Sequence, residues 1–123
     1  MNISDMVARV KRHPDFAGAG MVLCHNGVVR ATNAAGDKAV TSLTITADRE
    51  KLAEIVARHK RLPGIIEILA EIAPDGRKLS VGDDIMLLVV AGDVRKNVIP
   101  VMTSLIDEIK AKVTRKREVG DGD

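Results

Sequence analysis

The feature that most constrains the fold is an uninterrupted apolar run, Ile85–Ala91, which follows the turn-like segment Gly82-Asp83-Asp84. A strand with one face in water alternates apolar and polar side chains, whereas a strand covered on both faces can be apolar throughout. The run is also far shorter than the ~20 apolar residues that a helix needs to span a bilayer. It therefore predicts a central strand with other elements packed on both of its sides.

The segments around this strand predict the fold class. Helical spacing of apolar residues predicts a short helix from Ile3 that stops before Pro14, a second helix capped by Asp48, and a third from about Asn97 to Lys112. Alternating apolar residues predict strands near residues 21–29, 41–46 and 66–72. We therefore expect an α+β domain with a largely antiparallel sheet and helices packed on one face.

Two local details stay open. The Asn26-Gly27 pair is typical of a tight hairpin turn, but the same residues fit one long strand with a bulge at Gly27. In the third helix, Pro100 cannot donate a backbone hydrogen bond and fits best in the first turn. That position makes Asn97 the expected N-terminal cap.

The length of 123 residues suits one domain. We expect a single domain over residues 1–118, in which residues 1–18 form the N-terminal helix and a hinge. Residues 119–123, rich in glycine and aspartate, are expected to form a flexible tail. Because the first residues lack the apolar segment of a signal peptide, we expect a cytoplasmic protein that does not bind membranes.

The residue types exclude several kinds of chemistry. A single cysteine, Cys24, rules out an internal disulfide framework, and its apolar neighbourhood predicts a small buried side chain. His13, His25 and His59 lack the spacing of metal ligands, and His59 is expected to be half-buried on its helix. With one phenylalanine, no tyrosine, no tryptophan and a net charge of +2, the chain is poorly suited to nucleic acid.

The remaining candidates are cations. Arg30 closes an apolar strand, and Arg95 lies where the central strand meets the last helix. Lys110 and Lys116 lie near the end of that helix, in a stretch, residues 110–117, where five of eight residues are basic. Strand ends often border small-molecule pockets. The alternative is a solvated helix end, where each cation offsets the helix dipole by ~0.3–1 kcal/mol.

Five segments then occur in the order and near the spacing of motifs in a known family. They are Gly27-Val28-Val29-Arg30, residues 50–56, residues 79–84, Gly92-Asp93-Val94-Arg95 and residues 107–118. They resemble an early strand ending in Gly-x-Val-Arg, the first large helix, an L-x-x-G-[DE] turn, a His-Arg pair, and D-x-[LI]-K followed by W-K-[RK]-E. On these motifs the chain resembles the large, catalytic subunit of molybdopterin synthase, the MoaE family, over about residues 19–118.

The resemblance implies an α/β hammerhead fold and a sulfurtransferase. Such an enzyme converts cyclic pyranopterin monophosphate into the dithiolene of molybdopterin in two sulfur transfers. The sulfur arrives as a thiocarboxylate on the C-terminal Gly-Gly of a small ubiquitin-like subunit (MoaD-like), whose tail threads into the large subunit. No cofactor or metal is implied, and Cys24 need not take part. Because phosphate and carboxylate are anions, arginine and lysine are suitable ligands for them.

The resemblance also implies roles for residues near the C-terminus. Lys110 falls on the lysine closest to the partner's tail, where it would polarise the thiocarboxylate carbonyl or transfer a proton. With a one-residue deletion allowed, Lys116 falls on a second pocket lysine that would assist at the pterin. Arg117 and Glu118 follow in the segment that contacts substrate.

Two arginines complete the implied site. Arg30 falls on a substrate-binding arginine and Arg95 on the arginine of the His-Arg pair, and both would hold phosphate or pterin oxygens. Arg95 and Lys110 are 15 residues apart in sequence, which is ~22 Å along an unbroken helix. A pocket shared across a dimer interface would bring them together. We therefore expect a homodimer, within a heterotetramer that includes two small subunits.

Two residues depart from the family pattern. Val94 stands where the family usually has histidine, and Arg115 stands where it has tryptophan. The alternative to an active enzyme is therefore a non-catalytic MoaE-like module that still binds the small partner.

Overall fold

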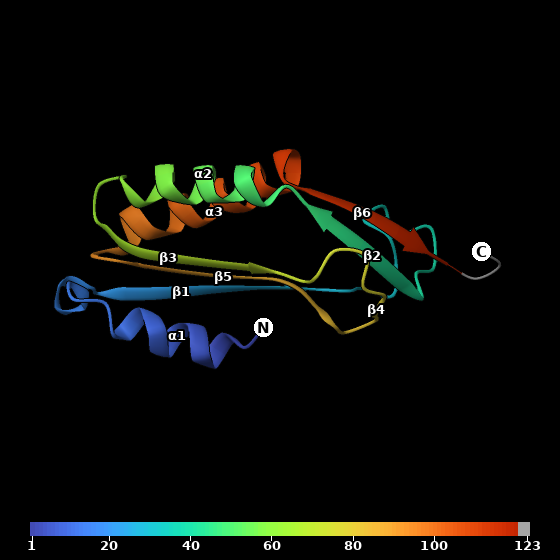
Figure 1. The fold of residues 1–123 in the computed structure, drawn as a ribbon, viewed down its shortest axis with the longest axis horizontal. Coiled ribbons are helices and arrows are strands. Elements are labelled where there is room, and N and C mark those ends of the chain that lie inside the picture. Colours follow the sequence, from blue (N-terminus) through green and yellow to red (C-terminus); the bar gives the residue numbers. More distant parts are fainter. Residues whose placement is uncertain (121–123) are drawn as a thin grey trace.

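The computed structural model describes residues 1–120. Its elements are α1 (Ile3–Lys11), η1 (Phe16–Gly18), β1 (Met21–Val28), β2 (Ser42–Ala47), α2 (Arg49–Lys60), β3 (Ile65–Ile72), β4 (Leu79–Ser80), β5 (Asp84–Gly92), α3 (Arg95–Lys112) and β6 (Thr114–Val119). The strands form two antiparallel three-stranded sheets, β1-β5-β3 and β4-β2-β6, which occupy opposite ends of the long axis in Figure 1. The expected α+β class with antiparallel pairing is confirmed.

β5 is the centre of the first sheet, as the apolar run predicts. It pairs with β1 on one side and β3 on the other, and every residue from Met86 to Gly92 is buried. Leu88 and Val90 belong to one apolar cluster, whereas Leu87 and Val89 belong to another on the opposite face. The absence of alternation in the sequence therefore reflects a strand that is covered on both faces.

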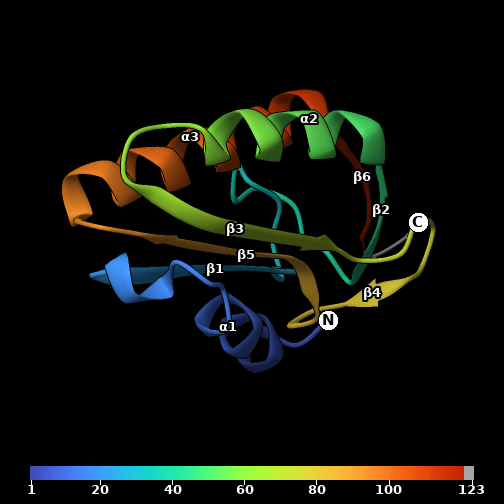
Figure 2. The same ribbon diagram turned by 60° about the vertical axis from the view of Figure 1, so that its left-hand side comes forward.

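We expected all helices on one face of the sheet, but they pack on both faces. Met6 and Val10 of α1 pack with the odd-numbered residues of β5, whereas Leu105 and Ile109 of α3 pack with the even-numbered ones. Figures 1 and 2 both show α1 on one side of the first sheet and α2 with α3 on the other. The physical reason is that β5 is apolar on both faces, and each face has to be removed from water.

The second sheet contains a strand that the sequence analysis does not predict. α3 ends at Lys112, and β6 then pairs along β2, from Thr114 opposite Ala47 to Val119 opposite Ser42. Lys116 therefore lies on a strand rather than near the end of a helix. The exposed residues 115–117 obscure the pattern, because consecutive charges give no alternation.

The last strand extends beyond the expected end of the domain at residue 118. Val119, expected in the tail, is the last residue of β6. Residues 121–123 of the expected tail lie outside the described residues. Within residues 1–120, no helix is both long and apolar enough to cross a membrane.

The structure distinguishes between the two alternatives at Gly27. β1 is one continuous strand rather than a hairpin, and its register against β5 shifts between Gly27 and Val28. This is the bulge, and the glycine allows the local change in backbone direction. As a result, β1 carries residues 21–28 along the full length of β5.

The start of α3 differs from the expected one. The helix begins at Arg95, so Asn97 is inside its first turn and Pro100 lies beyond that turn. The Asp93 carboxylate accepts hydrogen bonds from the Val94 backbone N–H (2.6 Å) and the Asn97 side-chain amide (2.9 Å), which lower the pKa of Asp93. The Asp93 carboxylate, four residues before the expected cap, therefore holds the Val94 backbone and the Asn97 side chain at the start of the helix.

The start of α2 agrees with the sequence, but one of its side chains is more buried than expected. Asp48 caps the helix and accepts a 3.0 Å hydrogen bond from the Lys51 backbone N–H. His59 is fully buried between α2 and α3 rather than half-buried. Its ring nitrogens contact the Ile55 carbonyl oxygen at 2.7 Å and the Ser104 hydroxyl at 2.8 Å, so its polar atoms are satisfied within the core.

Candidate functional site

A cavity of about 380 Å³ lies where the two sheets and α3 meet. Its lining comes from β1, the loop after β1, β2, β5, α3 and β6. The lining residues are His25, Gly27, Val28, Ala34, Ile45, Ile85, Met86, Lys110, Thr114 and Lys116. It is thus an apolar cavity with two cations, one imidazole and one hydroxyl, and none of its lining residues is acidic.

Lys110 and Lys116, two predicted site residues, meet in this cavity although they belong to different elements. Lys110 is in the last turn of α3, and Lys116 pairs with Ile45 in the second sheet. The buried side chain of Val113, between the two elements, fixes the corner where α3 passes into β6. Two ammonium groups in one apolar cavity without a carboxylate favour an anionic ligand.

His25 is a site residue that the sequence analysis does not identify. Alternation along β1 places it on the same face as Leu23, which packs against the core beneath α3. Its Nε2 atom is buried and has no hydrogen-bond partner among the described residues. Burial, together with the charge of Lys110, lowers the pKa of His25, so its imidazole is neutral at pH 7.

The missed histidine illustrates the limit of motif spacing. His25 has no metal-ligand partner in sequence, and only the fold brings it to a cavity that it shares with Lys110 at the end of α3. A polar, titratable residue between two apolar strand segments was the available signal. That pattern is also common for residues without a functional role.

Arg30 lies beside the cavity but does not line it. Its guanidinium donates hydrogen bonds to the carbonyl oxygens of Thr32 (3.2 Å) and Asn33. These contacts hold the loop that contributes Ala34 to the cavity wall. In this structure Arg30 therefore shapes the cavity edge rather than offering a free guanidinium to it.

Arg95 lies at the other end of the first sheet. It lines a separate depression of about 540 Å³ with Gly20, Met21, Asp93, Val94 and Lys96. Met21 pairs with Gly92, whereas Gly27 pairs with Met86. The two sites are therefore separated by about 20 Å, at ~3.3 Å per strand residue, and one chain does not bring Arg95 to Lys110.

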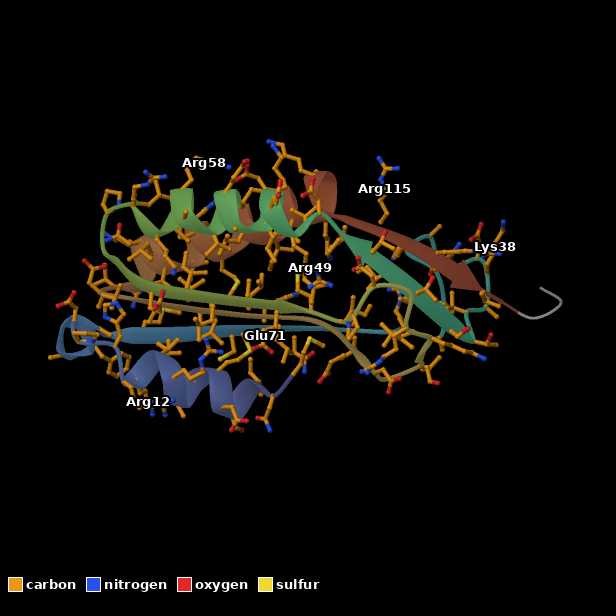
Figure 3. The ribbon with its side chains drawn as sticks, in the orientation of Figure 1. Arg12, Lys38, Arg49, Arg58, Glu71 and Arg115 are labelled. Atoms are coloured by element: carbon orange, nitrogen blue, oxygen red, sulfur yellow. The ribbon has the colours of Figure 1, made fainter. Side chains whose placement is uncertain are left out.

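The remaining predicted residues lie on the two faces of β6. Glu118 pairs with Leu43 and shares a face with Lys116, whereas Arg117 pairs with Thr44 on the opposite face. Arg115 shares the face of Arg117 and points away from the body of the protein in Figure 3. Of this segment, only Lys116 and Thr114 reach the cavity.

Cys24 is exposed, and its interpretation as a buried residue is wrong. Strand alternation directs its side chain to the face opposite that of His25. Partial burial nevertheless raises the pKa of its thiol. In residues 1–120, no group of three or more histidine, cysteine, aspartate or glutamate side chains could hold a metal ion.

A larger depression, of about 720 Å³, has a different character. It includes Arg49, Arg77, Glu71, Asp83 and Asp84 in its lining, and none of the predicted site residues lines it. Its charges are mixed, and Arg49 already donates to the Ile72 and Ala73 carbonyl oxygens and to Asp75. The smaller cavity, with two cations and no acid, is the better candidate for recognition of an anion.

The geometry defines the class of protein as an α+β protein of two antiparallel sheets, with a cationic cavity at their junction. Comparison with known families then identifies the family. The model of the family described as "MoaE protein" matches residues 1–112, and the chain belongs to this family. MoaE proteins are the large, catalytic subunits of molybdopterin synthase. The matched range includes Lys110 and ends before Lys116.

Solved structures share the fold at low sequence identity. Molybdopterin synthase from Staphylococcus aureus is 23% identical with a TM-score of 0.73, over 86% of this chain and 78% of that chain. Molybdopterin cofactor biosynthesis protein E from Burkholderia multivorans is 22% identical with a TM-score of 0.74, over 100% of this chain and 86% of that chain. A complex of subunits 1 and 2 of molybdopterin-converting factor from Helicobacter pylori is 15% identical with a TM-score of 0.74, over 100% and 82%. No curated protein matches the sequence significantly.

Proposed function

We propose that this chain transfers sulfur from the C-terminal thiocarboxylate of a small ubiquitin-like subunit to cyclic pyranopterin monophosphate, which yields the molybdopterin dithiolene. The observation that carries the proposal is the convergence of Lys110 and Lys116 on one cavity without acidic lining residues. A thiocarboxylate and a phosphate monoester are both anionic, and ammonium groups in an apolar cavity bind such ligands well. Membership of the MoaE family supports this choice of anions.

The two lysines have different roles in this proposal. Lys110, at the end of α3, polarises the thiocarboxylate carbonyl at the end of the partner's tail. Lys116, on β6, binds the pterin and its phosphate. Their positions on separate elements allow two ligands to meet between them, one beside each ammonium group.

The other predicted residues support the cavity from its edges. Arg30 holds the loop after β1, and in the proposal its guanidinium exchanges a carbonyl partner for a substrate oxygen. Glu118 continues the face of Lys116, and Arg117 faces the other side of the sheet. Arg95 contributes from a second copy of the chain, in a homodimer that carries one small subunit on each side.

The sulfur source is consistent with the only cysteine of the chain. Because the partner delivers sulfur, the large subunit needs no thiol of its own in the cavity. Cys24 does not line it. The H. pylori relative is a complex of two subunits of molybdopterin-converting factor, which supports a partner of this kind for the present chain.

A specific observation supports the alternative of a non-catalytic module. Val94 occupies the usual histidine position of the family, and its side chain is 50% exposed beside Arg95. An exposed valine can pack against a partner but cannot transfer a proton. The module would bind the small subunit without turnover.

Reconstitution distinguishes the two functions. The chain is mixed with thiocarboxylated small subunit and cyclic pyranopterin monophosphate, and dithiolene formation is measured for the wild-type protein and for Val94→His. Product from the wild-type protein supports the enzyme. A wild-type protein that binds the partner but forms no product, while Val94→His forms product, supports the module. The absence of both binding and product would reject both functions.

A further inference from the structure

The cavity is well supplied with proton donors and poorly supplied with acceptors. Its charged lining residues are Lys110 and Lys116, and none of its ten lining residues is an aspartate or a glutamate. A protonated lysine donates hydrogen bonds but has no lone pair to accept a proton. Among the lining residues, His25 is the side chain that carries a basic lone pair in its neutral form.

The position of His25 is fixed by the strand that carries it. His25 and Gly27 are two residues apart on β1 and share a face, and both line the cavity. A Cβ atom at Gly27 would lie 3.4 Å from His25 Nε2, so the imidazole extends over the glycine. Nε2 is buried and, within the described chain, has no hydrogen-bond partner. Such an atom is rare in folded proteins, where buried polar atoms are nearly always paired.

The surroundings of His25 keep its imidazole neutral. The charged groups that line the cavity around it are Lys110 from α3 and Lys116 from β6. β2, β5 and the loop after β1 contribute Ile45, Ile85, Met86 and Ala34, none of which ionises. Burial and the nearby charge of Lys110 both lower the pKa of His25. A neutral imidazole next to an ammonium group can accept a proton while its neighbour donates one.

We propose that His25 is the proton acceptor in the step in which water cleaves the bond between sulfur and the acyl carbon of the partner's tail. The inference rests on the proposed function. A thiocarboxylate that attacks through sulfur joins the pterin carbon while it is still bonded to its acyl carbon. Transfer is therefore complete only after that acyl–sulfur bond breaks.

The step balances without an oxidant or a reductant. The oxygen of water bonds to the acyl carbon, and the carbon–sulfur bond breaks with its electron pair on sulfur, as a thiolate on the pterin. His25 takes one proton from the water, and the carboxylic acid formed releases the other to solvent. Lys110 stabilises the negative charge that develops on the acyl oxygen. The two residues thus divide the roles of base and electrostatic stabiliser.

The test is a single-turnover reaction of the complex with thiocarboxylated partner and cyclic pyranopterin monophosphate, followed between about pH 5 and pH 8, the range where histidines titrate. Mass spectrometry measures the covalent partner–pterin adduct, and the release of carboxylate-ended partner measures its hydrolysis. With His25→Gln, hydrolysis is expected to slow by roughly 10²–10⁴-fold, the adduct accumulates, and the fall in rate at low pH disappears. His13→Gln, which changes a histidine outside the cavity, is the matched control and behaves as wild type.

Two further measurements keep the inference falsifiable. In His25→Gly, added imidazole is expected to restore hydrolysis but not to change adduct formation. NMR titration of His25 is expected to give a higher pKa in the Lys110→Ala variant than in the wild-type complex, because the variant lacks the neighbouring charge. A His25→Gln enzyme with the wild-type hydrolysis rate and pH profile would overturn the inference alone. A wild-type protein that makes neither adduct nor product would overturn the proposed function as well.

Discussion

Lys110 and Lys116 line one cavity from two different elements, the last turn of α3 and the middle of β6. The chain passes from α3 into β6 at the buried Val113, and the two lysines, six residues apart in sequence, line the same cavity. Neither lysine has an acidic partner in the lining of the cavity. The arrangement leaves both charges available to an incoming anion.

The first prediction concerns these two lysines. Lys110→Ala is expected to lower the rate of sulfur transfer by about 100-fold or more, because it removes electrostatic stabilisation in an apolar cavity. Lys116→Ala is expected mainly to raise the KM for the pterin. Both variants should fold as wild type, which circular dichroism and thermal melting check. Arg115→Ala, on the outward face of β6 in Figure 3, is the control, and an equal loss there would contradict the assignment.

The second prediction concerns Arg30, which holds the loop at the cavity edge through the Thr32 and Asn33 carbonyl oxygens. Arg30→Ala is expected to raise the KM for the pterin about tenfold, which corresponds to the free energy of one hydrogen bond to a charged group. The effect on kcat should be smaller. Hydrogen exchange in residues 31–39 should become faster. Arg30→Lys should not restore the loop, since lysine lacks the planar fork of arginine. Unchanged exchange in Arg30→Ala would show that the contacts do not hold the loop.

Sequence patterns predicted those parts of the fold that depend on neighbouring residues. The run Ile85–Ala91 gave the central strand and Asp48 gave the helix cap, because both signals are local. β6 was missed because residues 115–117 are charged on both faces of the strand. Its pairing with β2 depends on contacts between residues some 70 positions apart in sequence, from Ser42 with Val119 to Ala47 with Thr114.

The candidate site was predicted only in part, because it also depends on contacts between residues distant in sequence. The resemblance to MoaE placed Lys110 and Lys116 together, and they share a cavity. It also grouped Arg95 with them, although the first sheet separates Arg95 from that cavity within one chain. His25 had no motif to identify it, because its role depends on its position opposite Lys110 in the folded protein.

The third prediction concerns acid stability. Glu108 accepts hydrogen bonds from Arg58 at 3.2 and 2.6 Å and from Lys112 at 3.4 Å, and it lies 3.2 Å from His59 Nε2. These contacts, led by the Arg58 hydrogen bond, lower the pKa of Glu108 to about 2. A carboxyl group whose pKa is lowered in the folded state stabilises the fold fully at pH values above its pKa in the unfolded state. This stabilisation is lost as the pH falls toward 2, the pKa in the folded state.

The measurement is thermal unfolding between the ordinary glutamate pKa of ~4.3 and pH 2. The wild-type Tm is expected to fall more steeply over this range than that of Glu108→Gln, which cannot titrate. Glu54→Gln is the control, because Glu54 is exposed. Among the ion pairs of residues 1–120, Glu54 contacts only Lys51, which lies on the same helix. Equal pH slopes for wild type and Glu108→Gln would contradict the prediction.

The fourth prediction concerns the turn that supports the start of α3. Gly64 has a φ of +79°, and a Cβ atom there would lie 2.3 Å from Asp93 Oδ1 and 2.4 Å from Asn97 Nδ2. Gly76 has a φ of +76°, and a Cβ atom there would have no heavy atom within 4 Å apart from its own residue and its chain neighbours. Gly76→Ala should therefore cost only the backbone strain, ~1–2 kcal/mol. Gly64→Ala should cost a further ~1–3 kcal/mol, because it overpacks the site. Urea unfolding of both variants measures the difference, and equal losses would argue against close packing around Gly64.

The last prediction concerns Arg95, which lies about 20 Å from the cavity along β1, at ~3.3 Å per strand residue. If a second copy of the chain brings Arg95 to Lys110, each cavity of a dimer combines residues from two chains. Arg95→Ala and Lys110→Ala should each be inactive alone. After co-refolding, mixed dimers contain one cavity with both residues intact, so activity should recover to about a quarter of wild type, as random pairing in a two-fold dimer requires. The double variant Arg95→Ala/Lys110→Ala, co-refolded with wild type, is the control for exchange of chains. Two inactive variants that stay inactive after proven exchange would place Arg95 outside the catalytic site.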